Sequence, residues 1–395
     1  MTGRTTGRLA SLDAFRGFDM MFIMGLFGLC VGIAHLFGVR DETSGLLIQF
    51  HHVPWDGFHF IDSVFPTFLF IAGVSFPFSL AKSREKGLSD ARIWLRTLKR
   101  GVLLTVLGIV YNGCLTSGSD HFRFASVLQR IGVGWMLAGF VFLAIRNWKV
   151  RAGLFVGLLV FWWLLVQLVP APGTPADVDW MMTPHAPDKK TFYNLAVWFD
   201  HWLPGFLRTN WTIEPEGMLS HVGGVLTAMI GMFAGEFVMK TRGTLSGNRQ
   251  CVAMWIAAAV LLGVGLGIVA AGTPVVKAIW SASFVCCVGA YSLAAFAFFY
   301  WIIDVKGWQR WSFFFRVIGL NSITIYFIQS IFRTWDGANG PIGYFIGYVG
   351  PYSKACGLCG WLGEPWGVFV WGAVYFFGLW YVLYWLYKKQ IFFKV

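Results

Sequence analysis

The sequence predicts an all-α polytopic membrane protein, a bundle of about ten transmembrane helices that forms a single domain over residues 1–395. Apolar residues make up 57% of the chain and charged residues 13%, with a mean hydropathy of +0.63. A soluble domain would carry about a quarter charged residues. The 21 Trp residues suit a protein with aromatic belts at two membrane interfaces.

Ten apolar runs approach the roughly 20 residues that a membrane-spanning helix needs. They cover residues 17–38, 58–81, 101–116, 124–145, 150–170, 218–239, 251–272, 281–303, 312–333 and 366–387. The short, Gly-rich stretch 342–350 is interpreted as a loop or a re-entrant segment. No internal repeat of the kind found in many transporters is visible.

The orientation of the bundle is predicted by its charge asymmetry. Most of the 31 Lys and Arg residues fall in alternate short loops, and such loops are typical of the cytoplasmic side. Both termini are therefore expected in the cytoplasm, and the long loop 171–217 is expected outside. Because the net charge of +12 comes from these topology signals, we do not expect a nucleic-acid partner.

The most informative stretch lies where a polar loop enters the second apolar run. It contains three histidines, His51, His52 and His59, together with Asp56 and Asp62. Titratable groups at the edge of an apolar segment usually mark a functional site, and imidazole suits proton transfer near neutral pH. Asp62 could orient His52 if the loop folds back, as in catalytic triads. The alternative is an interfacial loop with solvated histidines.

A second polar group lies at the start of the first apolar run, where Arg8, Asp13, Arg16 and Asp19 occur. Asp13 and Arg16 are three residues apart, so on a helix they share a face and can pair. This pair could belong to a binding site or could simply seat the helix.

Polar residues inside or beside later apolar runs are further candidates. An arginine within a span, as predicted for Arg130, must meet an anion or a water-filled cavity. Its partner could be a substrate phosphate or a structural carboxylate. Small polar residues such as Ser281 and Asn321 often join helices instead. Cys356 and Cys359 lack a second ligand pair, so no metal site is predicted.

Seven motifs along nearly the whole chain resemble the heparan-α-glucosaminide N-acetyltransferase family, within the wider transmembrane acyltransferases. They are Arg8-Leu-Ala-Ser-Leu-Asp13-Ala-Phe-Arg16-Gly17; His52-Val-Pro-Trp55-Asp-Gly57 with Asp62 and Phe65-Pro66; Leu128-Gln129-Arg130; Pro215-Glu216-Gly217; Lys277-x-x-Trp280-Ser281-x-Ser283; Asp304-Val-Lys306-Gly307; and Asn321-Ser322.

The resemblance implies transfer of an acetyl group from cytosolic acetyl-CoA to the amino group of a glucosamine-type sugar on the opposite side of the membrane. It implies a multi-pass protein of the bacterial inner membrane, embedded in the lipid bilayer, homodimeric and free of metal. The implied catalytic residues are His52 and Asp62. Cofactor binding is assigned to Arg8, Arg16, Gln129, Arg130, Ser281 and Asn321, and substrate binding to Trp55, Asp56, Glu216 and Trp280.

One position departs from the family pattern. Phe27 stands where the family motif has an asparagine, so one polar contact near the site is lost, which leaves open a different acceptor or a different part of the mechanism.

Two questions stay open at the level of sequence. His52 could act as a general base toward the acceptor amine, or it could attack the thioester and form an acetyl-imidazole. A different class of function is also compatible with intramembrane Asp, Arg and His residues, namely a secondary transporter for an amino sugar or oligosaccharide.

Overall fold

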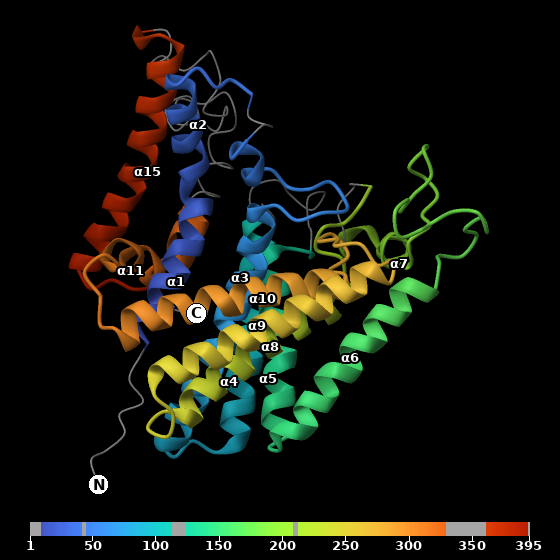
Figure 1. Ribbon diagram of the computed structural model, residues 1–395, viewed down its shortest axis with the longest axis horizontal. Coiled ribbons are helices and arrows are strands. Elements are labelled where there is room, and N and C mark those ends of the chain that lie inside the picture. Colours follow the sequence, from blue (N-terminus) through green and yellow to red (C-terminus); the bar gives the residue numbers. More distant parts are fainter. Residues whose placement is uncertain (1–8, 42–44, 113–123, 208–211, 329–360, 394–395) are drawn as a thin grey trace.

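The computed structural model describes residues 9–41, 45–112, 124–207, 212–328 and 361–393, and these residues fold as an assembly of helices (Figure 1). Across these ranges β-structure is limited to isolated bridges. The prediction of an all-α polytopic membrane protein is confirmed. The predicted feature at 342–350 lies outside the described residues.

Eight helical segments of the described chain are long and apolar enough to cross a membrane. The first, Ala10–Leu36, joins α1 (Ala10–Met21), the π-helical turn η1 (Phe22–Leu26) and α2 (Phe27–Leu36). The others are α3 (Phe60–Glu85), α5 (Val127–Ala144), α6 (Trp148–Leu168), α8 (His221–Thr241), α9 (Gly247–Ala270), α10 (Ala282–Tyr300) continued by η5 (Trp301–Val305), and α15 (Glu364–Lys388).

The remaining two predicted spans correspond to helices that are not among the eight: one is half charged and the other is interrupted. The run 101–116 is the apolar half of α4 (Asp90–Tyr111), whose first half is strongly charged. The run 312–333 begins as α11 (Phe313–Leu320), breaks at Asn321 and resumes as helix to residue 328, where the described segment ends.

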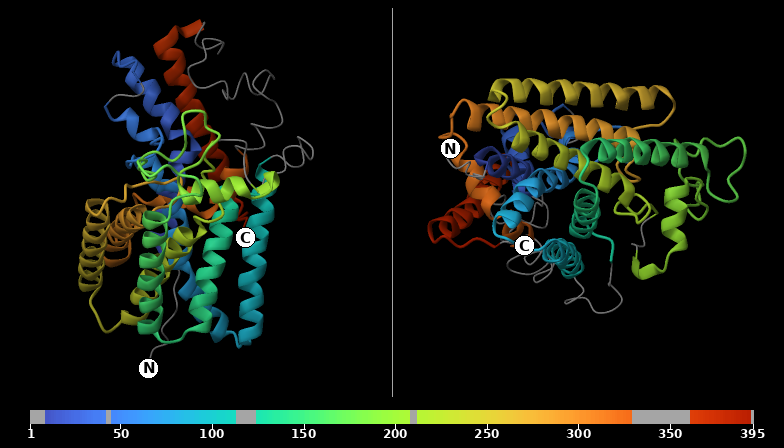
Figure 2. Two further views of the ribbon diagram at one scale, coloured as in Figure 1. Left: turned by 90° about the vertical axis from the view of Figure 1, so that its right-hand side faces the viewer. Right: turned by 90° about the horizontal axis from the view of Figure 1, so that it is seen from below.

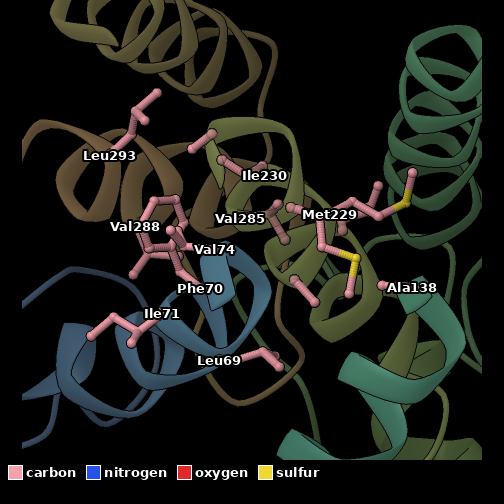
Figure 3. Packing of buried hydrophobic residues seen from close by; sticks show 14 of the residues in the cluster. Leu69, Phe70, Ile71, Val74, Ala138, Met229, Ile230, Val285, Val288 and Leu293 are labelled. Atoms are coloured by element: carbon pink, nitrogen blue, oxygen red, sulfur yellow. The ribbon is translucent and has the colours of Figure 1, made fainter. Parts of the chain in front are cut away.

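The helices α3, α8 and α10 form the centre of the larger part of the molecule. In α8 and α10, 72% of the most apolar stretch is buried, against 22% in the peripheral helices α6 and α9. Figures 1 and 2 both show α9 running alongside α10 at the outside. Phe70 and Val74 of α3 meet Met229 of α8 and Val288 of α10 in the core (Figure 3).

Glycines allow α3 and α8 to pack closely. A Cβ atom at Gly231 would overlap the Phe70 carbonyl, one at Gly235 would overlap the Val74 carbonyl, and one at Gly73 would overlap the Ala228 carbonyl. Small residues four apart on a helix face are a common means of close association within membranes. This contact fixes α3, whose first turn carries Asp62.

A smaller cluster unites the first span with the C-terminal helix. The chain kinks at Gly25, where φ is 111°, so that α1 and α2 run in different directions. Met24 and Val317 share a second apolar cluster with Phe376 and Leu383 of α15. Figure 1 shows α2 and α15 side by side, away from the larger part.

The loops gather at two opposite ends of the bundle. The α3–α4, α5–α6 and α8–α9 connections meet at one end (Figure 1), where Arg146 lies 3.6 Å from Asp90 and Arg151 lies 2.6 Å from Glu236. The segments before α3, before α8 and before α10 meet at the other end. The loops rich in Lys and Arg thus lie at one end of the bundle and the loops poor in these residues at the other, as the charge asymmetry predicted. The cytoplasmic location of the termini stays a prediction.

Replacing Gly231 with Leu should destabilise the fold by about 2 kcal/mol or more, because the side chain must push α3 away from α8. Thermal unfolding in detergent measures this effect. Gly263→Leu on α9 is the matched control, since nothing lies within 4 Å of a Cβ there. Equal melting temperatures for the two variants would contradict close α3–α8 packing.

Candidate active site

Asp62 is the buried centre of the polar network at the end of α3. It lies in the first turn of the helix, and only 1% of it is exposed. Its Oδ2 accepts hydrogen bonds from the backbone N–H groups of His59, at 3.1 Å, and Val53, at 3.3 Å. Carboxylates are favoured at helix N-termini because the first N–H groups have no helical partner. The preceding loop is thereby folded back onto α3.

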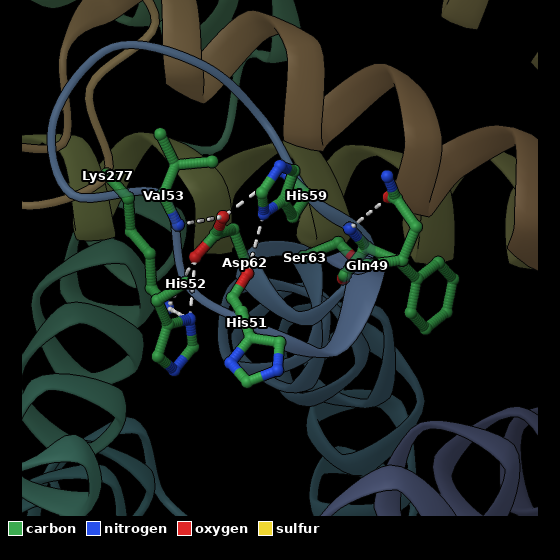
Figure 4. A network of polar contacts seen from close by, with 9 residues as sticks. Gln49, His51, His52, Val53, His59, Asp62, Ser63 and Lys277 are labelled. Atoms are coloured by element: carbon green, nitrogen blue, oxygen red, sulfur yellow. Dashed lines mark hydrogen bonds and ion pairs between the residues drawn. The ribbon is translucent and has the colours of Figure 1, made fainter. Parts of the chain in front are cut away.

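The other oxygen of Asp62 faces two side chains. Oδ1 lies 2.7 Å from His52 Nδ1 and 3.1 Å from Lys277 Nζ (Figure 4). His52 Nδ1 and Lys277 Nζ are themselves 3.0 Å apart. With Nδ1 protonated and donating to Asp62, the lone pair of the ring is on Nε2, which points away from the network in Figure 4. The His52 side chain is 61% exposed, so this nitrogen is accessible.

Lys277 reaches the site because two loops pair across the end of the bundle. The N–H of Val275 donates to the Asp56 carboxylate at 3.0 Å, and the N–H of Gly57 donates to the Val275 carbonyl at 3.0 Å. Asp56 and Val276 form an antiparallel bridge. The left-handed φ of 129° at Gly57 is strained for any residue with a side chain. The pairing holds the next residue, Lys277, over His52.

Burial lowers the pKa of Lys277, and the nearby Asp62 carboxylate opposes that shift. Lys277 belongs to one of the seven motifs, but no role in the site was expected for it. The available signal was its position, because Lys277 is one of few basic residues predicted on the external side.

The two neighbouring histidines have other surroundings. His59 Nδ1 lies 2.7 Å from the His51 carbonyl and so ties the loop to itself. The His51 ring meets Phe27 edge-on at 5.3 Å between centroids, and Phe27 stacks on Phe50 at 5.2 Å. The residue that departs from the family motif therefore supplies an apolar wall beside His51.

Arg130 and Gln129 belong to the same end of the molecule as His52. Arg130 lies in the first turn of α5 and is fully buried, with Nη2 donating to the Gly217 carbonyl at 2.8 Å and to Ser220 Oγ at 2.5 Å. Gln129 Nε2 lies 2.8 Å from His221 Nε2. These contacts join the starts of α5 and α8.

The predicted substrate residues occupy the same region. Trp280 is fully buried, its ring 4.6 Å from the Arg130 guanidinium, and its Nε1 donates to Thr227 Oγ1 at 3.1 Å. Trp55 is half-buried and donates to the Met181 carbonyl at 2.6 Å. Glu216 is half-buried and close enough to Lys277 for their charges to interact. The Trp280 ring thus packs against the Arg130 guanidinium inside the protein. Trp55 and Glu216, by contrast, are partly accessible to solvent.

Two predicted cofactor residues, Arg16 and Asn321, lie apart from this group. Arg16 contacts Asp13 Oδ1 at 3.5 Å and Ser75 Oγ at 3.4 Å. Ser75 is about 20 Å from Asp62 along α3, at about 1.5 Å per residue. Asn321 is buried and bonded to the backbone of Ile391 and Phe393.

Ser281 caps α10 and bonds to the Pro274 carbonyl, so it shapes the Lys277 loop. Arg8 lies outside the described residues. Among the residues that the structure does describe, no group of three or more His, Cys, Asp or Glu side chains is placed to hold a metal ion.

Comparison with known proteins identifies the relatives of this chain. It is 25% identical over 370 residues to the heparan-α-glucosaminide N-acetyltransferase of Homo sapiens, a match that covers 83% of this chain and 53% of the human protein. The Mus musculus protein of the same name is 25% identical over 366 residues, covering 82% and 53%. These matches support a distant relationship to that family. The chain spans about half the length of these relatives, and no family model matches it.

A second buried carboxylate, Asp200, lies close enough to Arg130 for their charges to interact. Asp200, in α7 (Leu195–Trp202), is 4% exposed and accepts a hydrogen bond from the Met218 N–H at 2.7 Å. Burial raises its pKa to about 7, although the Met218 hydrogen bond and the Arg130 charge oppose the shift. The folded protein therefore holds a proton on Asp200 at pH values where the unfolded chain has released it.

Because the folded-state pKa is the higher one, stability should fall as pH rises from about 4 to about 7, by up to about 1.4 kcal/mol per pH unit from this group. Asp200→Asn should flatten that dependence, as measured by the melting temperature at a series of pH values. Asp188→Asn, at an exposed site, should leave it unchanged. A wild-type slope that survives in Asp200→Asn would show that other groups cause it.

Proposed function

We propose that this protein is a transmembrane N-acetyltransferase that uses acetyl-CoA as donor and the amino group of a glucosamine-type sugar as acceptor. The observation that carries the proposal is the His52–Asp62 contact, which leaves His52 Nε2 accessible at one end of a membrane bundle. The distant relatives, named for N-acetyl transfer to heparan glucosamine, support the reaction class.

The chemistry requires a group that handles one proton. An acceptor amine must lose a proton as its nitrogen attacks the thioester carbonyl; the C–N bond forms, the C–S bond breaks and the CoA sulfur leaves. His52 Nε2 can take the amine proton as general base. It can instead attack the carbonyl itself and pass the acetyl group on. Asp62 stabilises the imidazolium that either path creates.

The donor is proposed to lie along the bundle. Arginines bind phosphates through charge-assisted hydrogen bonds. Arg16, and Arg8 eight residues before it in the sequence, would hold the nucleotide end of acetyl-CoA toward the basic loops. The thioester would reach the end of the bundle that carries His52, where Gln129 and Arg130 lie. Ser281 and Asn321 would act indirectly, since their polar atoms already serve the protein backbone.

The acceptor is proposed to enter from the opposite side. Trp55 and Asp56 follow His52 in the same loop, and Glu216 interacts with Lys277. These residues would offer the aromatic and carboxylate groups that suit an amino sugar, and Trp280 would act through Arg130, against which its ring packs. With the basic loops in the cytoplasm, the end of the bundle that carries His52 and the loop 171–217 are external. Residence in a bacterial inner membrane and a homodimeric state follow from the family resemblance and belong to the proposal.

The function is tested by incubating the purified protein with labelled acetyl-CoA and a panel of amino sugars, and by reconstituting it in vesicles with labelled sugar. We expect acetylated sugar whose formation depends on both substrates. Uptake of unmodified sugar without acetylation would favour the transporter instead.

His52→Ala should lower acetyl transfer on the order of a hundred- to ten-thousand-fold, the usual contribution of a general base. Binding of CoA should be largely unchanged, because the base acts mainly on the transition state. His51→Ala is the matched control and should cost much less. Full activity in the His52 variant would remove this histidine from the mechanism.

Arg16→Ala should weaken CoA binding about tenfold or more, because a hydrogen bond between charged groups is lost. Isothermal titration with CoA measures the change. Arg92→Ala removes an exposed arginine near the same end and should have little effect. Identical affinity in the two variants would exclude Arg16 from the binding site.

A further inference from the structure

Lys277 is the third member of the polar network at His52, and no role in the proposed reaction has been given to it. Its Nζ lies 3.1 Å from Asp62 Oδ1 and 3.0 Å from His52 Nδ1. Its side chain is 23% exposed, so this contact is substantially shielded from water. The sequence separation of 215 residues from Asp62 means that tertiary structure alone creates the contact.

The hydrogen bonds around Asp62 define what Lys277 can do. Oδ2 already accepts two backbone N–H groups, so His52 and Lys277 must share Oδ1. A protonated lysine has donors and no acceptor. If Lys277 donated to Nδ1, the ring proton would move to Nε2 and the accessible nitrogen could not act as a base. The 2.7 Å contact between Nδ1 and the carboxylate favours the other tautomer, with the Nε2 lone pair available.

The charges around His52 also decide whether the ring takes up a second proton. Asp62 alone would favour the imidazolium. The Lys277 ammonium, whose Nζ lies 3.0 Å from His52 Nδ1, disfavours it. Glu216 and Arg130 are the other charged groups that interact with Lys277, and their charges have opposite signs. His51, His59 and Asp56 lie on the loop of His52 itself. Removal of Lys277 would leave an excess of negative charge beside the imidazole.

We propose that Lys277 is a positioning residue that shares Asp62 with His52: its positive charge disfavours a second proton on the imidazole, while the Asp62 contact holds the ring proton on Nδ1 and the lone pair on Nε2. The consequence for catalysis rests on the proposed function: the enzyme would retain a competent base or nucleophile at lower pH than a His–Asp pair alone would allow. The electrostatic effect itself belongs to the site whatever reaction occurs there.

The reactivity of His52 toward diethyl pyrocarbonate tests the proposal without an acetyl-transfer assay. An unprotonated imidazole nitrogen attacks a carbonyl carbon of the reagent, forms an N-carbethoxy bond and displaces ethyl carbonate, which breaks down to ethanol and carbon dioxide. The modified residue is located by mass spectrometry. The rate against pH reports the fraction of His52 that is unprotonated.

In Lys277→Met, the pH at which His52 reacts at half its maximal rate should rise by about one unit. This is the lower end of the effect of a charge within ~4–6 Å, because the ring is partly exposed and solvent screens it. Lys277→Gln should show the same rise, and Lys277→Arg should stay near wild type because the charge is kept. Lys190→Met removes an exposed lysine and should change nothing.

An unmoved midpoint in the Met and Gln variants, or an equal shift in Lys277→Arg, would overturn the proposal. The acid limb of acetyl transfer should move with the chemical midpoint. If no acetyl transfer is found in any variant while the chemical midpoint still shifts, the proposed function fails and the role of Lys277 stands.

Discussion

The site depends on one constraint, which is that the buried Asp62 carboxylate must be fully paired. A carboxylate that is 1% exposed at the end of a membrane helix is costly unless hydrogen bonds and a counter-charge compensate it. The α3 N-terminus supplies part of that compensation through backbone N–H groups. His52 and Lys277 supply the remaining hydrogen bonds and the counter-charge, and both side chains therefore lie beside Asp62 Oδ1.

Packing far from the chemistry supports this arrangement. Glycines such as Gly231 let α3 and α8 approach until their backbones touch, which fixes the height of Asp62 in the bundle. Arg130, buried against the Trp280 ring, joins the starts of α5 and α8 on the other side. The 51–59 and 271–281 loops then pair across the top. The His52 loop is thus held between packed helices, yet the His52 side chain remains 61% exposed.

The sequence predicted much of this and missed what depends on long-range contact. Hydropathy located the apolar runs. A contact between His52 and Asp62 was also considered from sequence, and the structure contains it, because the two residues are only ten positions apart on one folded-back loop. Lys277 had no assigned role because its contact requires two distant loops to pair. For Asn321 the family resemblance implied cofactor binding, and its hydrogen bonds to the backbone of Ile391 and Phe393, 70 and 72 residues away, could not be predicted.

The central claim is that the charge of Asp62 both balances Lys277 and orients His52, and a comparison of Asp62→Asn with the double variant Asp62→Asn/Lys277→Met tests it most directly. The single variant leaves a shielded ammonium without its counter-charge, so its melting temperature should fall. The double variant should recover stability but not acetyl transfer, because His52 still lacks its carboxylate. Full activity in the double variant, or a single variant as stable and active as wild type, would contradict this account.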